Sequence, residues 1–162
     1  MSEANVTLGI MSEGWQSYQQ KLIEALAPLS AEQLALCATP SLRSIEQLAR
    51  HMVSVRAGWF HRFLGEGDDD FGALATWDAP NSPVRSTSEL IEGLTATWRV
   101  MREALARYTP ADLQETIERV RYGQTVRLTR GWVVWHLIEH DLHHGGELAY
   151  SLGMHGLTAP DI

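Results

Sequence analysis

Five of the seven histidines of this 162-residue chain lie in one stretch near its C-terminus, between positions 136 and 155. Three pairs in this stretch have a spacing that suits one face of a helix: 136 with 140, 140 with 143, and 140 with 144. Residues three or four apart on a helix are neighbours, about 5–6 Å apart. Two imidazoles at that spacing can bind one metal ion through their neutral ring nitrogens. The stretch is therefore a candidate metal site.

The apolar pattern of the same segment selects His140 and His144 from this group. The inward-facing positions of the expected helix are Val133, Leu137, His140, His144, Leu148 and Leu152. Burying two imidazoles is costly unless their ring nitrogens have partners, and one metal ion would supply a partner to both. His143 lies off this face and is expected to be exposed. His136 lies to one side of it, where it could support a ligand.

A third candidate ligand, His51, comes from a segment far upstream. Ser44 and Gln47 form a capping-box pair that predicts the start of a helix, and His51 lies on or beside the apolar face of that helix. Two ligands from one helix and one from another leave an open coordination position, which is typical of catalytic zinc sites. The His-Glu-x-x-His motif of zinc proteases is absent, because Glu139 precedes His140 instead of following a histidine.

Four long segments with helical periodicity would hold these histidines in place. Their apolar residues recur every three or four positions near residues 8–29, 44–64, 86–108 and 129–153. Pro28 indicates that the first helix has ended by that point. We expect a single all-α domain over residues 1–162, folded as a four-helix bundle with long crossover connections.

The segments between the expected helices have distinct compositions. The connection from about residue 65 to 86 is long for a bundle and permits a crossover between helices that are not antiparallel neighbours. Its acidic run, 68–70, lacks the ligand spacing of an EF-hand and is expected to be a solvated loop. Residues 115–128 alternate polar and β-branched side chains around Tyr122-Gly123, which predicts either a short hairpin or an irregular loop.

The overall composition excludes several classes of partner. A formal net charge of −7 without a long basic run disfavours binding to nucleic acid through phosphate contacts. The sequence has neither the basic start of a signal peptide nor an apolar run long enough to span a membrane. Cys37 is the only cysteine, and it lies among apolar residues, where we expect it to be packed. The six tryptophans are expected mainly in the core. We expect a cytoplasmic protein.

Two segments resemble the DinB/YfiT-like superfamily of metal-binding four-helix bundles. The run from Ser44 to His51 is similar to the superfamily's second-helix histidine segment, and His140-x-x-x-His144-Gly-Gly-Glu-Leu is similar to its fourth-helix pattern His-x-x-x-His-Arg-Gly-Gln. With the order and length of the helices, the resemblance covers nearly the whole chain. It implies that His51, His140 and His144 form a divalent-metal triad. The chain departs from the pattern at Gly145, where many relatives have Arg, and at Glu147, where many have Gln.

The resemblance also implies a chemistry. Characterised relatives include transferases and isomerases that depend on mycothiol, bacillithiol or glutathione. By this resemblance the ion, which we expect to be zinc or nickel, would bind the thiolate of a low-molecular-weight thiol that attacks a small-molecule substrate. Catalytic residues beyond the ligands are not identified. Proteins of this superfamily are often dimers, so a homodimer is expected.

Three alternatives remain open from the sequence. A metal-bound water could support hydrolysis instead of thiol transfer. The chain could also be a stress-related metal-binding domain without catalytic activity. In the third alternative no metal binds, and the histidines serve packing or respond to pH.

Overall fold

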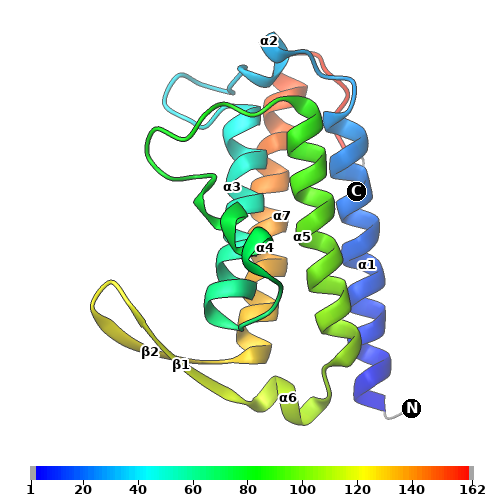
Figure 1. Cartoon of the computed structure of the whole chain (residues 1–162). Coiled ribbons are helices and arrows are strands. Elements are labelled where there is room, and N and C mark those ends of the chain that lie inside the picture. The colour runs from blue at the N-terminus through cyan, green and yellow to red at the C-terminus, as the bar shows by residue number, and fades with distance from the viewer. Residues whose placement is uncertain (1–2, 161–162) are drawn as a thin grey trace.

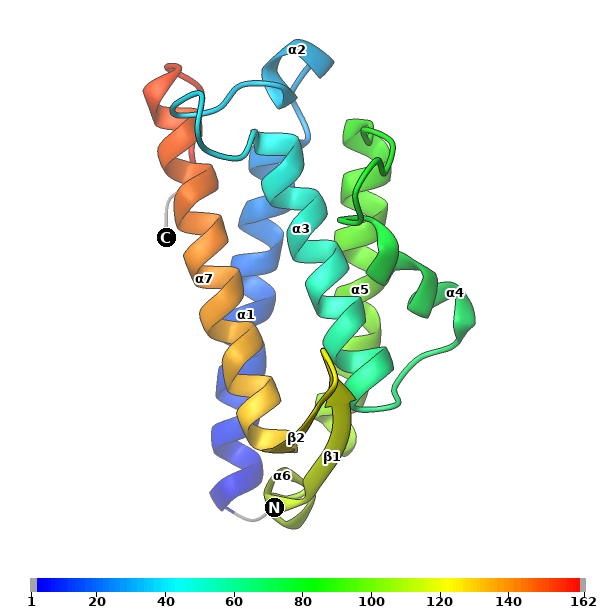
Figure 2. The same ribbon diagram turned by 90° about the vertical axis from the view of Figure 1, so that its left-hand side faces the viewer.

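The computed structural model describes the backbone of residues 3–160 and the side chains of residues 7–120 and 122–160. Four long helices lie side by side: α1 (Glu3–Leu26), α3 (Ile45–Ala57), α5 (Thr87–Arg107) and α7 (Arg130–Met154). Figures 1 and 2 show that α1 and α7 run in one direction, and α3 and α5 run in the other. Because α3 and α5 run in the same direction, the segment that connects them passes back along the length of the molecule. This is the crossover that the length of the connection permits.

The helices begin and end where local signals place them. The side chain of Ser44 accepts a hydrogen bond from the Gln47 backbone amide at 3.2 Å, and the Gln47 side chain accepts one from the Ser44 amide at 2.9 Å. This reciprocal pair satisfies two amides that the first turn of α3 leaves without helical partners. Ser86 and Glu89 form the same capping box at the start of α5. Helix α1 ends at Leu26, two residues before Pro28.

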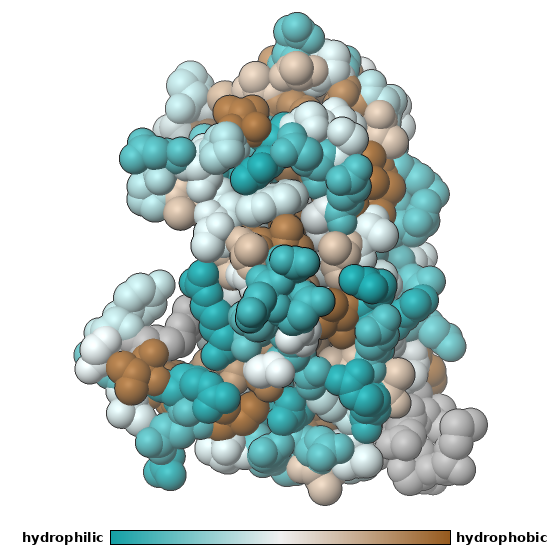
Figure 3. Space-filling view, viewed as in Figure 1, coloured by the Kyte–Doolittle hydropathy of each residue, from teal (hydrophilic) through white to brown (hydrophobic). Residues whose placement is uncertain are grey.

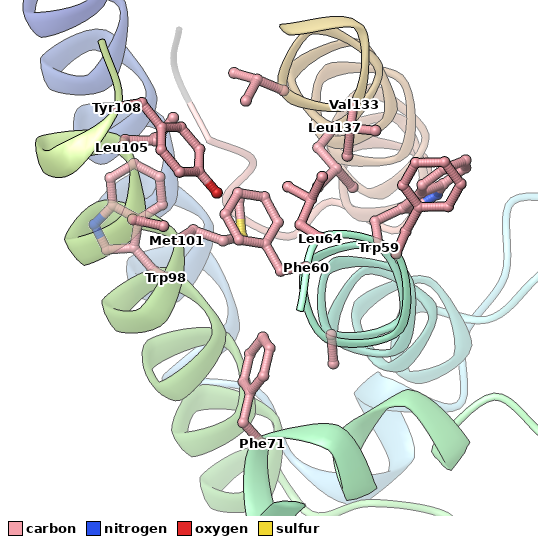
Figure 4. Close-up of a cluster of buried hydrophobic side chains, with 14 of the residues drawn as sticks. Trp59, Phe60, Leu64, Phe71, Trp98, Met101, Leu105, Tyr108, Val133 and Leu137 are labelled. Atoms are coloured by element: carbon pink, nitrogen blue, oxygen red, sulfur yellow. The ribbon is translucent and has the colours of Figure 1, made fainter. Parts of the chain in front are cut away.

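At its C-terminal end α3 continues into a π-helical segment, η1 (Gly58–Phe63), which the sequence analysis does not predict. The Leu64 amide bonds the carbonyl of Trp59, five residues back, at 3.0 Å. Figure 4 shows Phe60 pointing from this segment toward Met101 on α5, whereas Trp59 lies on the other side of the helix. Phe60 and Met101 are fully buried in a core cluster formed with α5 and α7. The π segment therefore directs one aromatic ring into the core and another toward the flank of α7.

The connection between α3 and α5 contains α4 (Asp69–Ala73) and a 3-10 turn, η2 (Leu74–Thr76). The expectation of a solvated acidic loop is wrong in part. Residues 68–70 are exposed, but the Asp68 carboxylate accepts a hydrogen bond from the Phe71 amide at 2.9 Å and so caps α4. A carboxylate is favourable at this position because it accepts a hydrogen bond from a backbone amide that has no partner within the helix. It is also attracted to the positive end of the helix dipole.

Short elements complete the chain, namely α2 (Ala31–Leu34), α6 (Pro110–Gln114), β1 (Thr116–Arg121) and β2 (Gln124–Thr129). The two strands form an antiparallel hairpin. Of the two alternatives for residues 115–128, the hairpin is therefore correct and the irregular loop is wrong. The expected all-α fold is corrected to a mostly helical fold that contains one hairpin. Tyr122 and Gly123 at its tip both have positive φ, 51° and 75°, as a tight two-residue hairpin turn requires.

Side-chain burial agrees only partly with the sequence-based expectations. Trp15, Trp59 and Trp98 are buried, but Trp132 and Trp135 are exposed on α7. Cys37 is half-buried instead of fully packed. Within the described residues, no helix has both the length and the apolar character that crossing a membrane requires.

Candidate metal centre

The imidazole rings of His51, His140 and His144 lie together between α3 and α7. Their centroids are 4.4 to 4.9 Å apart, and one possible ligand atom of each lies within 4.8 Å of the others. The Nε2 atoms of His51 and His140 are 3.1 Å apart. A tetrahedral zinc ion with bonds of ~2.0–2.1 Å holds its ligand nitrogens roughly 3.3 Å apart. The three histidines selected from the sequence are therefore placed where they could hold one ion.

Carboxylates orient two of the three rings. The Nδ1 atom of His51 is 2.7 Å from Oδ2 of Asp78, and the Nδ1 atom of His144 is 2.6 Å from Oε2 of Glu147. A carboxylate on Nδ1 favours the tautomer whose proton is on that atom, which leaves the lone pair of Nε2 free. Metal-binding histidines are commonly held in this way. The arrangement therefore fits a metal site better than it fits simple packing.

His140 differs from the other two because its Nδ1 atom is buried and has no hydrogen-bond partner among the described residues. Burial lowers the pKa of His140 to about 2, and the neighbouring imidazoles of His144 and His51 act in the same direction. Burial also lowers the pKa of His144, although Glu147 opposes the shift. Both rings are therefore neutral at physiological pH, the form in which imidazole binds a metal. These observations show that the residues present fit a divalent ion.

Asp78 reaches the centre because the connection between α3 and α5 is fixed to α3. The Arg50 guanidinium donates to the carbonyl of Trp77 at 2.8 Å, and the Ser54 hydroxyl donates to the carbonyl of Ala75 at 2.9 Å. Trp77 lies so close to Gly93 on α5 that a Cβ atom there would be 2.7 Å from its ring. These contacts set the position of the residue that follows Trp77. Asp78 cannot be identified from the sequence, because no local pattern connects it with His51.

A buried ion pair joins the two helices that carry the histidines. The guanidinium of Arg56 on α3 donates to the carboxylate of Asp141 on α7, with contacts of 2.7, 3.0 and 3.1 Å, and both side chains are fully buried. Trp15 on α1 donates to the same carboxylate through Nε1 at 2.6 Å, and Gln19 accepts from Arg56 at 2.7 Å. Asp141 directly follows His140, so this network fixes α3 and α7 beside the triad. No motif in the sequence marks Arg56 and Asp141 as partners, because they are 85 residues apart.

The two departures from the superfamily pattern both have structural explanations. A Cβ atom at Gly145 would collide with the hydroxyl of Tyr18. Burial raises the pKa of Tyr18 to about 12. The Tyr18 hydroxyl donates to the carbonyl of Asp141 at 3.3 Å. A larger residue at position 145 is therefore incompatible with this placement of Tyr18. Glu147 bonds His144, as described above.

The remaining histidines of the stretch lie outside the triad. His143 is exposed, as expected, and its Nε2 atom is 3.6 Å from Glu147. The ring of His136 stacks on Trp132, with centroids 4.9 Å apart and planes at 15°. It also meets the edge of Trp59 at 5.1 Å. His136 thus joins an aromatic group beside the centre, with its ring 6.1 Å from that of His140.

Fold and site together define a predominantly helical protein with three histidines placed for one divalent ion. The chain belongs to the DinB family, whose model matches residues 1–162, and the resemblance seen in the sequence is thereby confirmed. It is similar to the crystal structure of a DinB-like protein from Bacillus cereus ATCC 10987, with 22% identity, coverage of 93% of each chain and a TM-score of 0.67. At that identity the likeness concerns the fold. No curated protein matches the sequence.

Proposed function

We propose that this protein is a metal-dependent enzyme that transfers a small thiol to an electrophilic small molecule, and that His51, His140 and His144 bind its ion. One observation carries the proposal: three imidazoles converge, and carboxylates hold the Nδ1 atoms of two of them, His51 and His144. Three protein ligands leave a position for an exogenous ligand. A divalent ion bound there would lower the pKa of a thiol in that position and keep it ionised at neutral pH.

The surrounding carboxylates favour thiol transfer over hydrolysis. Asp78 and Glu147 each use one carboxylate oxygen to hold a ring nitrogen, so we assign them the role of orienting the ligands and not that of the base that activates a water molecule. A thiolate needs no such base once it is ionised. In the transfer its sulfur forms a bond to an electrophilic carbon, the leaving group departs with the bonding electrons, and the thiol proton passes to solvent.

The first experiment is metal analysis of the freshly purified protein, followed by reconstitution with zinc or nickel. We expect about one equivalent per chain, and loss of the ion in His140→Ala. His61→Ala is the control, because this histidine belongs to neither group of described residues that could hold an ion, whereas His143 forms a second such group with His144 and Glu147. A protein that binds no divalent metal after reconstitution, or a His140→Ala variant with unchanged metal content, contradicts the proposal.

The second experiment separates thiol transfer from the other functions. In the cobalt-substituted protein, glutathione, bacillithiol or mycothiol should change the visible spectrum as sulfur becomes a ligand. Turnover of an electrophile such as 1-chloro-2,4-dinitrobenzene should then require both metal and thiol. A spectrum that no thiol alters, together with metal-dependent ester hydrolysis, would support the hydrolase alternative. A spectrum that no thiol alters without any turnover would support a binding domain.

We also propose that the long helices act as a four-helix bundle that pairs with a second copy. Trp135 and Leu142 are seven residues apart on α7, and both are about half exposed. Met11 on α1 lines the same apolar depression as Trp135. Apolar side chains gathered on one face are typical of homodimer interfaces. Light scattering of the purified protein, compared with a Trp135→Glu variant, tests this association.

A further inference from the structure

A pocket of about 340 Å³ lies between the η1 segment and the β1–β2 hairpin. Val55, Trp59 and Phe63 provide apolar walls, while Arg62 and Arg119 stand at its border. Figure 3 shows the surface hollowed between the hairpin, at lower left, and the upper part of the molecule. The pocket thus combines an apolar interior with two exposed guanidinium groups.

These two arginines differ from most others in the described part of the chain, where guanidinium groups have carboxylate partners. The paired ones are Arg43, Arg50, Arg56, Arg85, Arg107, Arg127 and Arg130. No ion pair joins Arg62 or Arg119 to a described carboxylate, although the whole chain carries a net charge of −7. Arg119 donates one hydrogen bond, to the backbone carbonyl of Glu118 at 2.9 Å, which leaves its charge uncompensated. Two cations without a carboxylate partner at one pocket create a local positive potential, which favours an anionic ligand. Arginine in particular matches the geometry of a carboxylate.

The register of the hairpin explains why Arg119 faces the body of the protein. Side chains alternate between the two faces of a strand, so Arg119 shares a face with Ile117, and Val126 is its cross-strand partner. Ile117 is buried, and Val126 packs against the core. Arg127 lies on the opposite face, where it pairs with Glu118 at 2.8 Å. One hairpin therefore presents one arginine toward the pocket and another toward solvent.

The pocket is next to the histidine triad. His51, Val55 and Trp59 follow one another at four-residue intervals along the same helix, so the pocket wall begins one turn after His51. Eight residues at ~1.5 Å each separate His51 from Trp59 by roughly 12 Å. On the α7 side, His136 bridges the space, with its ring 5.1 Å from Trp59 and 6.1 Å from His140. The pocket and the triad are therefore neighbours along α3, and the His136 ring lies between them.

We propose that this pocket binds a small organic acid, with its apolar part against Trp59 and Phe63 and its carboxylate paired with Arg62 and Arg119. The opposite, reactive end of the ligand then lies at the triad. This second statement rests on the proposed function, whereas recognition of the carboxylate does not. The two arginines are thus residues that determine specificity for acidic over neutral compounds.

The test measures binding of 3-phenylpropionate and of its neutral counterpart 3-phenylpropan-1-ol to the full-length protein, by calorimetry, with and without bound zinc. We expect the acid to bind at least tenfold more tightly than the alcohol, including in the metal-free protein. Arg62→Gln and Arg119→Gln should each weaken binding of the acid about tenfold, the loss typical of one charge-assisted hydrogen bond, and leave binding of the alcohol unchanged.

Arg127→Gln is the matched control, because it removes the same charge from the other face of the same hairpin. Circular dichroism and metal content should be the same in all three variants, since each altered side chain is exposed. Equal affinity for acid and alcohol, or equal effects of Arg119→Gln and Arg127→Gln, would overturn the proposal. Because the metal-free measurement does not depend on the triad, failure of the pocket and failure of the proposed enzyme are distinguishable.

Discussion

The hydrogen bond between Asp78 and His51 offers the sharpest test of the metal centre. Asp78→Ala removes the only described carboxylate that contacts Nδ1 of His51, at 2.7 Å, and leaves all three proposed ligands in place. Without it the ring is free to rotate or to move its proton to Nε2, the atom that faces His140 at 3.1 Å. We therefore expect metal binding to weaken without being abolished.

The size of the effect follows from the role of such partners. Loss of a carboxylate behind a metal-binding histidine typically reduces affinity about 10- to 100-fold, or ~1.4–2.7 kcal/mol. The side chains of His51 and Asp78 are 16% and 29% exposed, so water can replace part of the lost bond and the lower end of this range is expected. Asp78→Asn should lose less than Asp78→Ala, because an amide oxygen can still accept the Nδ1 proton.

The assay is competition between the protein and a zinc-binding dye at pH 7.5. Asp70→Ala is the control, since it removes an exposed carboxylate from the same connection without touching a histidine. Thermal unfolding of the metal-free variants separates a loss of affinity from a loss of fold. If Asp78→Ala binds zinc within twofold of the wild type and of Asp70→Ala, the carboxylate does not orient His51, and the reasoning fails.

Three further predictions concern stability. Asp141→Asn should lower the free energy of unfolding by ~3–5 kcal/mol in urea titrations, because it leaves the buried Arg56 cation without a counter-charge; a cost below ~1 kcal/mol would contradict this. Gly145→Ala should cost ~1–3 kcal/mol through overpacking against Tyr18. The same change at Gly146, inside α7 and with open space around it, should instead stabilise the protein by ~0.5–1 kcal/mol, because alanine favours a helix interior more than glycine does; thermal melts measure both. The metal-free protein should become less stable as pH falls from about 6.5 toward 2. Burial lowers the pKa of His140 in the folded protein, so the unfolded chain binds a proton more readily than the folded protein does. His140→Phe should reduce this dependence of stability on pH.

The local parts of this molecule can be predicted from the sequence. The capping box at Ser44 fixes where α3 begins, and the position of His51 on that helix follows from the count of residues. In the same way, the three- and four-residue spacing of apolar side chains in α7 separates His140 and His144 from the exposed His143. These features depend only on helical geometry, so one sequence is enough to recognise them.

The residues that support the ligands cannot be predicted in this way, because tertiary contacts place them. Asp78 meets His51 only because Trp77 fits against Gly93 and because Arg50 and Ser54 hold the backbone of the connection. Nothing in the sequence near residue 78 indicates these contacts. The π segment at the end of α3 cannot be predicted either, because its sequence continues the apolar pattern of a regular helix.

The buried pair of Arg56 and Asp141 shows why a charged network can accompany a metal site inside a helical core. Arg56 lies five residues after His51, and Asp141 directly follows His140, so the ion pair and the Nε2 contact join the same two helices. Apolar residues at these positions would pack in several similar registers, whereas a guanidinium and a carboxylate are satisfied in only one. A sliding movement of α7 along α3 would separate the buried charges and the ring nitrogens together. We therefore expect the pair to fix the position of α7 relative to α3, and with it the spacing of the triad, so that Asp141→Asn weakens metal binding as well as stability.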